Sequence, residues 1–183
     1  MPRMSAEAVH TPWSEPLTHA DLQRMPEDGR RYELINGSLL VTPAPNTRHQ
    51  VAVFRLAKLL DEIPGTMVLP APLDWIISEH DVPQPDVTLA PTEAYSERGL
   101  EGAPLLVAEV LSPSTRTFDL RVKRELYEAA GVPRYWIVDP IVPSVVVLLL
   151  TDDGFVEVAR LQDDDVYDDV QLGVAVVPSR LVD

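Results

Sequence analysis

The sequence predicts an α/β (α+β) fold in which helices flank a mixed β-sheet, with a β-hairpin near each end of the chain. The run from Leu105 to Leu111 is apolar at nearly every position, which is typical of a central strand covered on both faces. Segments of helical and strand character alternate along the chain, and strand–helix–strand order indicates a mixed sheet with helices packed on it. Asn36-Gly37 stands between two alternating apolar runs, which is the strongest short-range signal for a hairpin.

Composition indicates one globular domain. The chain has 183 residues, of which 45% are hydrophobic, enough for a substantial core. We expect a loose arm over residues 1–16, rich in Pro, Ser and Thr, and a single domain over residues 17–183. The chain has no cysteine, which excludes disulfides and thiol catalysis and agrees with a cytoplasmic location. Neither a signal peptide nor an apolar run of the ~20 residues that span a bilayer is visible, so no membrane partner is expected.

Charge is strongly acidic overall but uneven along the chain. A net charge of −14 argues against tight non-specific binding to nucleic acid. Three acidic clusters are expected in solvated turns and lack the EF-hand pattern of calcium sites: Asp152-Asp153, Asp163 to Asp165, and Asp168-Asp169. Five of the fifteen basic residues nevertheless fall in one short stretch, around the acids considered below: Arg116, Arg121, Lys123, Arg124 and Arg134. Such local positive charge can favour binding of a phosphate even where the net charge is negative.

Two helices and two strands are predicted in the first third of the chain. A short helix spans Thr18 to Met25, because Thr18 is a favourable N-cap and Pro26 stops the helix. Strands at Arg31–Leu34 and Ser38–Val41 flank the Asn-Gly turn. A longer helix runs from Thr47 to Glu62, where apolar residues recur at near-helical spacing.

The remaining elements are mostly strands, with one further helix that ends before Gly131 and Pro133. Tyr95 to Ala103 is expected to be a loop, and one or two edge strands are expected after residue 161. The predicted elements are strands at Thr66–Leu69, Leu73–Ser78, Asp86–Leu89 and Leu105–Leu111, a helix at Thr117–Ala130, a strand at Tyr135–Val138, and a hairpin of Ser144–Thr151 with Phe155–Leu161.

Two acids stand beside predicted strands. Glu109 lies in the all-apolar run, where a carboxylate is costly to bury unless it is paired or binds a metal. Asp86 follows Pro85 at the start of another strand. Mg²⁺ prefers oxygen ligands and is often held by one or two carboxylates, water and a substrate phosphate. The pair could therefore bind metal. Alternatively, Glu109 forms a buried ion pair with a nearby arginine, and Asp86 only caps a turn.

Two further side chains could complete such a site. Lys123 belongs to a stripe at helical spacing that should pack on the sheet, and its ammonium group could stabilise charge on a phosphorane-like transition state. Alternatively, Lys123 and Asp119 form a surface i,i+4 pair. Glu33 shares a strand face with Ile35, and its side chain either points into a cleft or lies at an edge. His49 could approach phosphate or metal, although a lone histidine near a helix start is more often a hydrogen-bonded surface group.

Several ordered motifs resemble the Uma-type family of putative restriction endonucleases, which belongs to the PD-(D/E)XK nuclease superfamily. The resemblance covers roughly residues 18–180. Its motifs are Tyr32 to Gly37, Pro45 through His49, Gln84 to Val87, Ala108 to Thr115, the residues Asp119, Lys123 and Tyr127, and Gly131 to Asp139.

The resemblance implies a restriction-endonuclease-like core, a Mg²⁺-dependent site in which Mn²⁺ can substitute, and frequent dimerisation. By position, Asp86 and Glu109 correspond to the metal-binding acids and Glu33 to an additional site acid. The superfamily places a lysine two residues after the glutamate, where this chain has Leu111. In this family the lysine is found on the following helix, which implies a catalytic role for Lys123.

Three functions remain open from the sequence. The first is a metal-dependent endonuclease that hydrolyses phosphodiester bonds of DNA and acts as a homodimer. The second is a non-catalytic module that binds nucleic acid or protein, which is consistent with the net charge of −14. The third is a metal-dependent hydrolase of smaller phosphate esters. Because one fold hosts many functions, the site residues decide between them.

Overall fold

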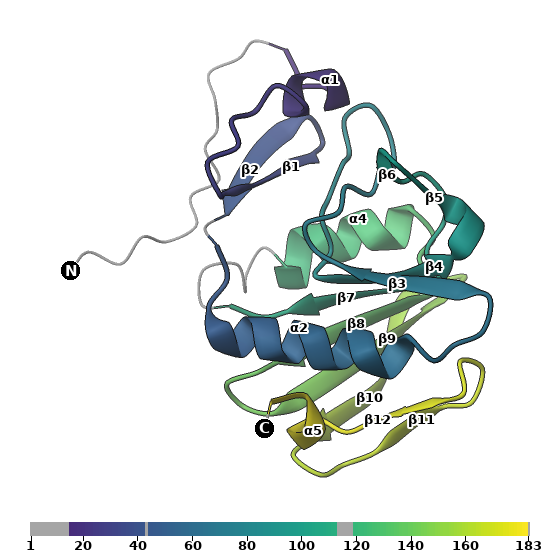
Figure 1. Cartoon of the computed structure of the whole chain (residues 1–183). Coiled ribbons are helices and arrows are strands. Elements are labelled where there is room, and N and C mark those ends of the chain that lie inside the picture. The colour runs from purple at the N-terminus through teal and green to yellow at the C-terminus, as the bar shows by residue number, and fades with distance from the viewer. Residues whose placement is uncertain (1–14, 43, 113–118, 183) are drawn as a thin grey trace.

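The centre of the protein is a six-stranded mixed β-sheet, seen in a computed structural model that describes residues 15–42, 44–112 and 119–182 (Figure 1). The strand order is β10-β9-β8-β7-β4-β3. Strands β7 and β8 are parallel, and the other neighbouring pairs are antiparallel. The strands span Thr66–Pro70 (β3), Val87–Pro91 (β4), Leu106–Val110 (β7), Arg134–Asp139 (β8), Ser144–Thr151 (β9) and Gly154–Gln162 (β10). The predicted mixed sheet is confirmed.

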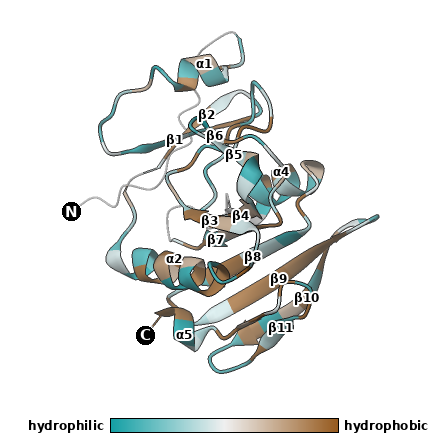
Figure 2. Ribbon diagram, turned by 45° about the vertical axis from the view of Figure 1, so that its right-hand side comes forward, coloured by the Kyte–Doolittle hydropathy of each residue, from teal (hydrophilic) through white to brown (hydrophobic). Residues whose placement is uncertain are grey.

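Hydrophobic layers cover both faces of this sheet. On one face lie α2 (Thr47–Leu60) and α5 (Ser179–Val182), and α2 buries Ala52, Val53, Leu56 and Leu60 against the strands. On the other face lies α4 (Arg124–Ala129), whose Tyr127 ring meets the Tyr135 ring edge-on at a centroid distance of 5.2 Å. Figure 2 shows the hydrophobic residues concentrated on the sheet and on α2. Strand β7 is therefore buried on both faces, as the apolar run predicted.

A separate two-stranded hairpin lies near the N-terminus, beside the short helix α1 (His19–Leu22). It pairs β1 (Arg31–Ile35) with β2 (Ser38–Thr42). The turn has positive φ at both central residues, 51° at Asn36 and 68° at Gly37, as hairpin turns of this length favour. The hairpin is joined to the body of the protein by backbone hydrogen bonds between Leu34 and Val82. The predicted hairpin is confirmed, and it carries two residues of the candidate site.

Two local predictions between β3 and β7 are wrong. Leu73–Ser78 is not a strand: Trp75 forms an isolated bridge with Leu100, and its indole N–H donates to the Gly102 carbonyl. Here the packed indole holds the backbone in place, and no continuous ladder of strand hydrogen bonds forms. The expected loop at Tyr95–Ala103 contains a small hairpin, which is too short to show an alternating pattern. After a 3₁₀ turn, η1 (Thr92–Ala94), it pairs β5 (Tyr95–Ser96) with β6 (Gly99–Leu100).

The C-terminal strands also differ from expectation. Strands β11 (Tyr167–Asp169) and β12 (Val174–Val176) pair with each other as a ribbon and do not extend the sheet. Asp169, expected in a solvated turn, is buried and accepts a 2.8 Å hydrogen bond from Nε of Arg134. Because Tyr135 pairs with Val107 in parallel register, Arg134 lies beside the start of β7, away from the end that carries Glu109. Arg134 therefore belongs to a structural ion pair.

Several expectations concern segments with little or no description. The N-terminal arm lies largely outside the described residues, and Arg116 lies outside them as well. The helix predicted over Thr117–Ala130 is described from residue 119, as a π-helical turn, η2 (Asp119–Lys123), that leads into α4. Among the described residues, no helix is long and apolar enough to cross a membrane.

Candidate active site

Strand register brings Asp86 and Glu109 side by side. In the antiparallel pair of β4 and β7, Val87 lies opposite Ala108. The residue before Val87 and the residue after Ala108 are Asp86 and Glu109, so the next step of the ladder places the two acids across from each other. Oδ2 of Asp86 accepts a 2.9 Å hydrogen bond from the backbone N–H of Val110. Both acids are almost fully buried, at 2% and 1% exposure.

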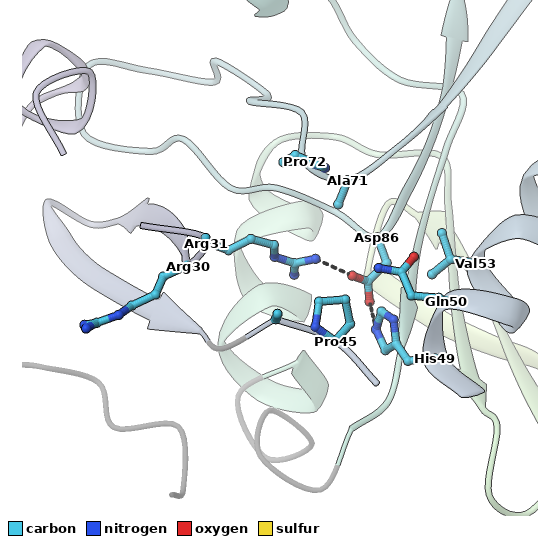
Figure 3. A pocket seen from close by; sticks show the side chains of 11 residues that line it. Arg30, Arg31, Pro45, His49, Gln50, Val53, Ala71, Pro72 and Asp86 are labelled. Carbon is cyan, nitrogen blue, oxygen red and sulfur yellow. Dashed lines mark hydrogen bonds and ion pairs between the residues drawn. The ribbon is translucent and has the colours of Figure 1, made fainter. Parts of the chain in front are cut away.

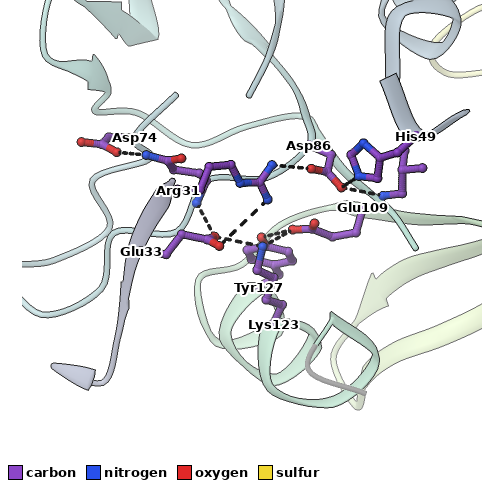
Figure 4. A network of polar contacts seen from close by, with 10 residues as sticks. Arg31, Glu33, His49, Asp74, Asp86, Glu109, Lys123 and Tyr127 are labelled. Carbon is purple, nitrogen blue, oxygen red and sulfur yellow. Dashed lines mark hydrogen bonds and ion pairs between the residues drawn. The ribbon is translucent and has the colours of Figure 1, made fainter. Parts of the chain in front are cut away.

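Asp86 is held as a carboxylate by three different donors (Figure 4). Besides the Val110 N–H, Nη1 of Arg31 donates to Oδ1 at 2.7 Å, and Nε2 of His49 lies 3.0 Å from Oδ2. Burial alone raises the pKa of Asp86, but the hydrogen bond with His49 and the charges of Arg31, His49 and Lys123 together hold that pKa well below its ordinary value. Asp86 is therefore ionised at neutral pH.

Glu109 projects toward α4 and meets two polar groups there. Nζ of Lys123 lies 3.0 Å from its Oε1, and the Tyr127 hydroxyl donates to the same oxygen at 2.6 Å. The cation in these two contacts is a lysine, whereas the ion-pair alternative named an arginine. Burial first and the charge of Glu109 second raise the pKa of Tyr127 well above its ordinary value, so Tyr127 stays protonated and can donate.

Lys123 links the sheet acids to the N-terminal hairpin. Its Nζ lies 2.9 Å from Oε1 of Glu33 as well as 3.0 Å from Oε1 of Glu109. Lys123 is 1% exposed, so it lies inside the protein and not on its surface. It is the last residue of the π-helical turn η2, a wider turn that occurs often at functional sites. The side chain of Asp119, its alternative partner, is outside the described part of the chain.

Glu33 completes the group from β1. Its side chain is fully buried, and Oε1 also accepts a 2.8 Å hydrogen bond from the backbone N–H of Gln84. Nη2 of Arg31 lies 4.0 Å from Oε2. Oε2 itself is buried and has no hydrogen-bond partner among the described residues. Glu33 thus points inward, which resolves the alternative of an edge position, and the structure brings all four predicted residues together.

Three contact residues were not predicted as members of the site. His49, expected at the surface, is 7% exposed. Asn46 caps the first turn of α2 by accepting from the His49 backbone N–H, and the imidazole lies 3.0 Å from Asp86. Arg31 stands two residues before Glu33 on β1, and alternation along a strand could have placed both on one face. Tyr127 stands four residues after Lys123, on the same helical stripe. The sequence therefore carried a signal for Arg31 and for Tyr127.

A cavity of about 220 Å³ opens beside this group (Figure 3). Arg31 and His49 reach Asp86 from two sides of it, and Arg30 and Gln50 also line it. Ala44, Pro45, Val53, Ala71 and Pro72 form its apolar wall. The buried carboxylates thus border a space that a small part of a larger molecule could enter.

Comparison with known proteins places the chain in a family. A family described as "Uma2: Putative restriction endonuclease" matches residues 19–175. The chain belongs to this family. Its fold also matches the crystal structure of "a putative nuclease belonging to DUF820" from Anabaena variabilis ATCC 29413, with a TM-score of 0.72 and 17% sequence identity, over 91% of this chain and 98% of that chain. None of the curated proteins compared with the chain matches it significantly.

Membership of this nuclease family implies a divalent metal ion, and the donors present fit one. Asp86 and Glu109 offer hard carboxylate oxygens on neighbouring strands, and Oε2 of Glu33 is buried without a hydrogen bond among the described residues. Within the same residues, no group of three or more His, Asp or Glu side chains is already arranged around one point. Two carboxylates suffice for Mg²⁺, which usually keeps several waters and takes substrate oxygens as further ligands.

Proposed function

We propose that this protein is a Mg²⁺-dependent endonuclease that hydrolyses phosphodiester bonds of DNA, and that Mn²⁺ can replace Mg²⁺. The observation that carries the proposal is the convergence of Glu33, Asp86, Glu109 and Lys123 from three separate parts of the fold. Burying three carboxylates together is costly, and a fold retains such a cost where charge is needed for function. Membership of a restriction-endonuclease family supports the same conclusion.

In this proposal Asp86 and Glu109 hold the metal. When bound, the ion polarises a phosphoryl oxygen and lowers the pKa of a bound water. Asp86 is suited to this role because its pKa is lowered, which leaves the oxygens deprotonated at any physiological pH. Its carboxylate is oriented by the Val110 N–H and by His49, so little ordering remains to be done on binding.

Lys123 supplies fixed positive charge next to the metal-binding acids. Its ammonium group lies between Glu33 and Glu109, at 2.9 and 3.0 Å, in a site closed to bulk water. A preorganised cation in such a place stabilises the negative charge that develops on a phosphorane-like transition state. Glu33 holds the ammonium group in position, and Tyr127 holds the carboxylate of Glu109. Lys123 thus takes the part that the superfamily lysine plays from a different position in the chain.

DNA is the proposed substrate, and a homodimer is the proposed assembly. A single cavity beside Asp86 serves one strand, so cutting both strands of a duplex suits two copies related by a two-fold axis. With a net charge of −14, contact with the phosphate backbone must come from local cations such as Arg30 and Arg31 at the cavity. We therefore expect few phosphate contacts, so the affinity for DNA should fall with added salt along a shallow slope.

The test is cleavage of a panel of supercoiled, linear and single-stranded DNA in Mg²⁺ or Mn²⁺, with Asp86→Asn purified in parallel. Cation-dependent cleavage by the wild type that is lost in Asp86→Asn supports the proposal. Equal cleavage by both proteins assigns the activity to a contaminant or another site. DNA binding without cleavage, unchanged in Asp86→Asn, would support the non-catalytic module. Hydrolysis of nucleotides or chromogenic diesters but not of DNA would support an esterase.

A further inference from the structure

We propose that Arg31 is an internal substitute for the metal ion: it neutralises Asp86 while no metal is bound, leaves Asp86 when a metal binds, and then contacts a phosphate of the substrate. This inference rests on the proposed function, because it concerns the same carboxylates. It assigns to Arg31 a role that none of the superfamily positions named above covers.

The contacts of Asp86 leave little room for a second cation. Oδ2 is engaged by the Val110 N–H at 2.9 Å and by His49 at 3.0 Å, and Oδ1 is engaged by Nη1 of Arg31 at 2.7 Å. A metal ion must therefore approach through Oδ1, where the guanidinium lies. Two cations at one carboxylate oxygen repel each other strongly in a buried site. Binding of metal and pairing with Arg31 therefore compete.

Charge within the group gives the same result. Glu33, Asp86 and Glu109 face Arg31 and Lys123, three negative groups against two positive ones, with all five side chains largely buried. Without metal, the two cations leave these five groups with one net negative charge. Adding a divalent ion reverses the balance, and expelling one resident cation or adding an anionic phosphate restores it.

Of the two cations, Arg31 is the one free to move. Lys123 is 1% exposed and lies between two carboxylates, whereas the Arg31 side chain is 16% exposed and lines the cavity. A guanidinium has five N–H donors, and among the described residues Arg31 makes one side-chain hydrogen bond, to Asp86. Its Nε is buried without a hydrogen-bond partner in the same part of the chain. Moving Arg31 therefore breaks few contacts.

The cavity offers Arg31 a destination. Arg31 lines it together with the apolar residues Ala44, Pro45 and Pro72 and points its guanidinium toward Asp86, so a phosphate entering beside Asp86 would meet this group, whereas the Arg30 side chain extends away from Asp86 (Figure 3). The planar guanidinium matches two oxygens of a phosphate. The arginine released from Asp86 is thus placed to bind the substrate beside the carboxylates. Exchange of this kind would make metal and substrate binding mutually supportive.

The experiment measures Mn²⁺ binding directly by calorimetry, without DNA. We compare the wild type, Arg31→Gln, and Arg30→Gln as the matched control, because Arg30 lines the same cavity but pairs with Asp28. Arg31→Gln should bind Mn²⁺ roughly tenfold tighter or more, since it removes the competing cation. Arg30→Gln should stay within about threefold of the wild type, because its charge is exposed and screened. Equal or weaker binding by Arg31→Gln would overturn the inference.

A second measurement uses the wild type alone, in case Arg31→Gln does not fold. Nitrogen-15 spectra resolve arginine Nε–H groups, and a Mg²⁺ titration should shift the signal of Arg31. Arg134, buried against Asp169 at 2.8 Å, is the internal control and should not shift. An Arg31 signal that does not change at saturating Mg²⁺ would contradict the exchange.

Asp86→Asn separates failure of this inference from failure of the proposed function. If Mn²⁺ binding depends on Asp86 but is unaffected by Arg31→Gln, the inference fails and the metal site stands. If neither the wild type nor Arg31→Gln binds Mn²⁺ in a manner that depends on Asp86, the metal site fails and the inference fails with it.

Discussion

Nζ of Lys123 lies 3.0 Å from Oε1 of Glu109, and both groups are inside the protein, although fourteen residues separate them in the chain. A lysine two residues after the glutamate would reach the same space directly from the strand. Here Leu111 occupies that position and packs in the hydrophobic layer under α4. The π-helical turn η2 instead delivers the ammonium group from the adjacent helix.

The Lys123–Glu109 contact predicts non-additive stability. Lys123→Met removes the ammonium group from between the buried carboxylates of Glu33 and Glu109 and should lower the free energy of unfolding by about 3–5 kcal/mol. Adding Glu109→Gln removes one of these charges, so the double variant should be more stable than the sum of the single effects by about 0.5–3 kcal/mol. Urea unfolding of the four proteins of the cycle measures this coupling. Additive effects would show that the two side chains do not interact.

Tyr127 is predicted to be a positioning residue for Glu109. Tyr127→Phe removes the hydroxyl that donates to Oε1 at 2.6 Å but keeps the ring in the core. We expect kcat for DNA cleavage to fall about 10- to 100-fold, the usual effect of losing a group that orients a metal ligand, with little change in KM. Tyr95→Phe is the control, because its hydroxyl donates only to the backbone carbonyls of Met67 and Thr88 among the described groups. A rise in KM with unchanged kcat would argue against this role.

Asp86 predicts a pH dependence of stability. Burial, the largest effect, raises the pKa of Asp86. The hydrogen bond with His49 and the charge of Arg31 nevertheless bring the pKa in the folded protein below its ordinary value. A lowered folded pKa gives stability that is fully present above the unfolded pKa of about 3.9 and is lost as pH falls toward the folded pKa.

The free energy of unfolding should therefore drop from about pH 5 downward more steeply in the wild type than in Asp86→Asn. Denaturant unfolding at pH values between neutral and about 2.5 follows this difference. If the difference between the two proteins is constant across the range, Asp86 does not carry the linkage.

The turn of the N-terminal hairpin predicts a stability difference between two glycines. Gly37 and Gly29 both have positive φ, 68° and 79°, so alanine costs about 1–2 kcal/mol at either. At Gly37 the added Cβ would also clash with the Cβ of Pro16, whereas at Gly29 nothing lies within 4 Å of an added Cβ.

Gly37→Ala should therefore lower the melting temperature more than Gly29→Ala and should also reduce cleavage, because the same hairpin carries Arg31 and Glu33. Thermal unfolding and cleavage assays of both variants measure the two effects. Equal losses of stability would mean that Pro16 moves aside without cost.

Much of the fold could be predicted because the local signals were strong. The Asn36-Gly37 turn, the periodic helix α2 and the apolar strand β7 each follow from a few residues. Trp75 shows where such reasoning fails, since a side chain packed into the core overrides strand propensity. The prediction that Asp169 lies in a solvated turn failed for a different reason: its partner Arg134 is thirty-five residues away, and no local pattern indicates the pairing.

The four predicted site residues lie together in the structure, but their surroundings could be predicted only in part. A buried acid such as Glu109 signals that some partner exists without saying which. Whether His49 reached Asp86 depended on the angle between α2 and the sheet, which sequence does not give. The contacts of Arg31 depended likewise on how the separate hairpin docks against Val82. Tertiary geometry therefore decided the second layer of the site.

The most direct test of the nuclease site compares variants matched for burial. Asp86→Asn and Glu109→Gln each remove a buried carboxylate within the site, whereas Asp169→Asn removes one that pairs with Arg134 elsewhere. The measurement is the rate of supercoiled DNA cleavage in Mn²⁺ at a temperature where all the proteins are folded. We predict losses of at least about 100-fold for the two site variants and nearly unchanged cleavage for Asp169→Asn. Equal rates for all the variants and the wild type would contradict the assignment of the site.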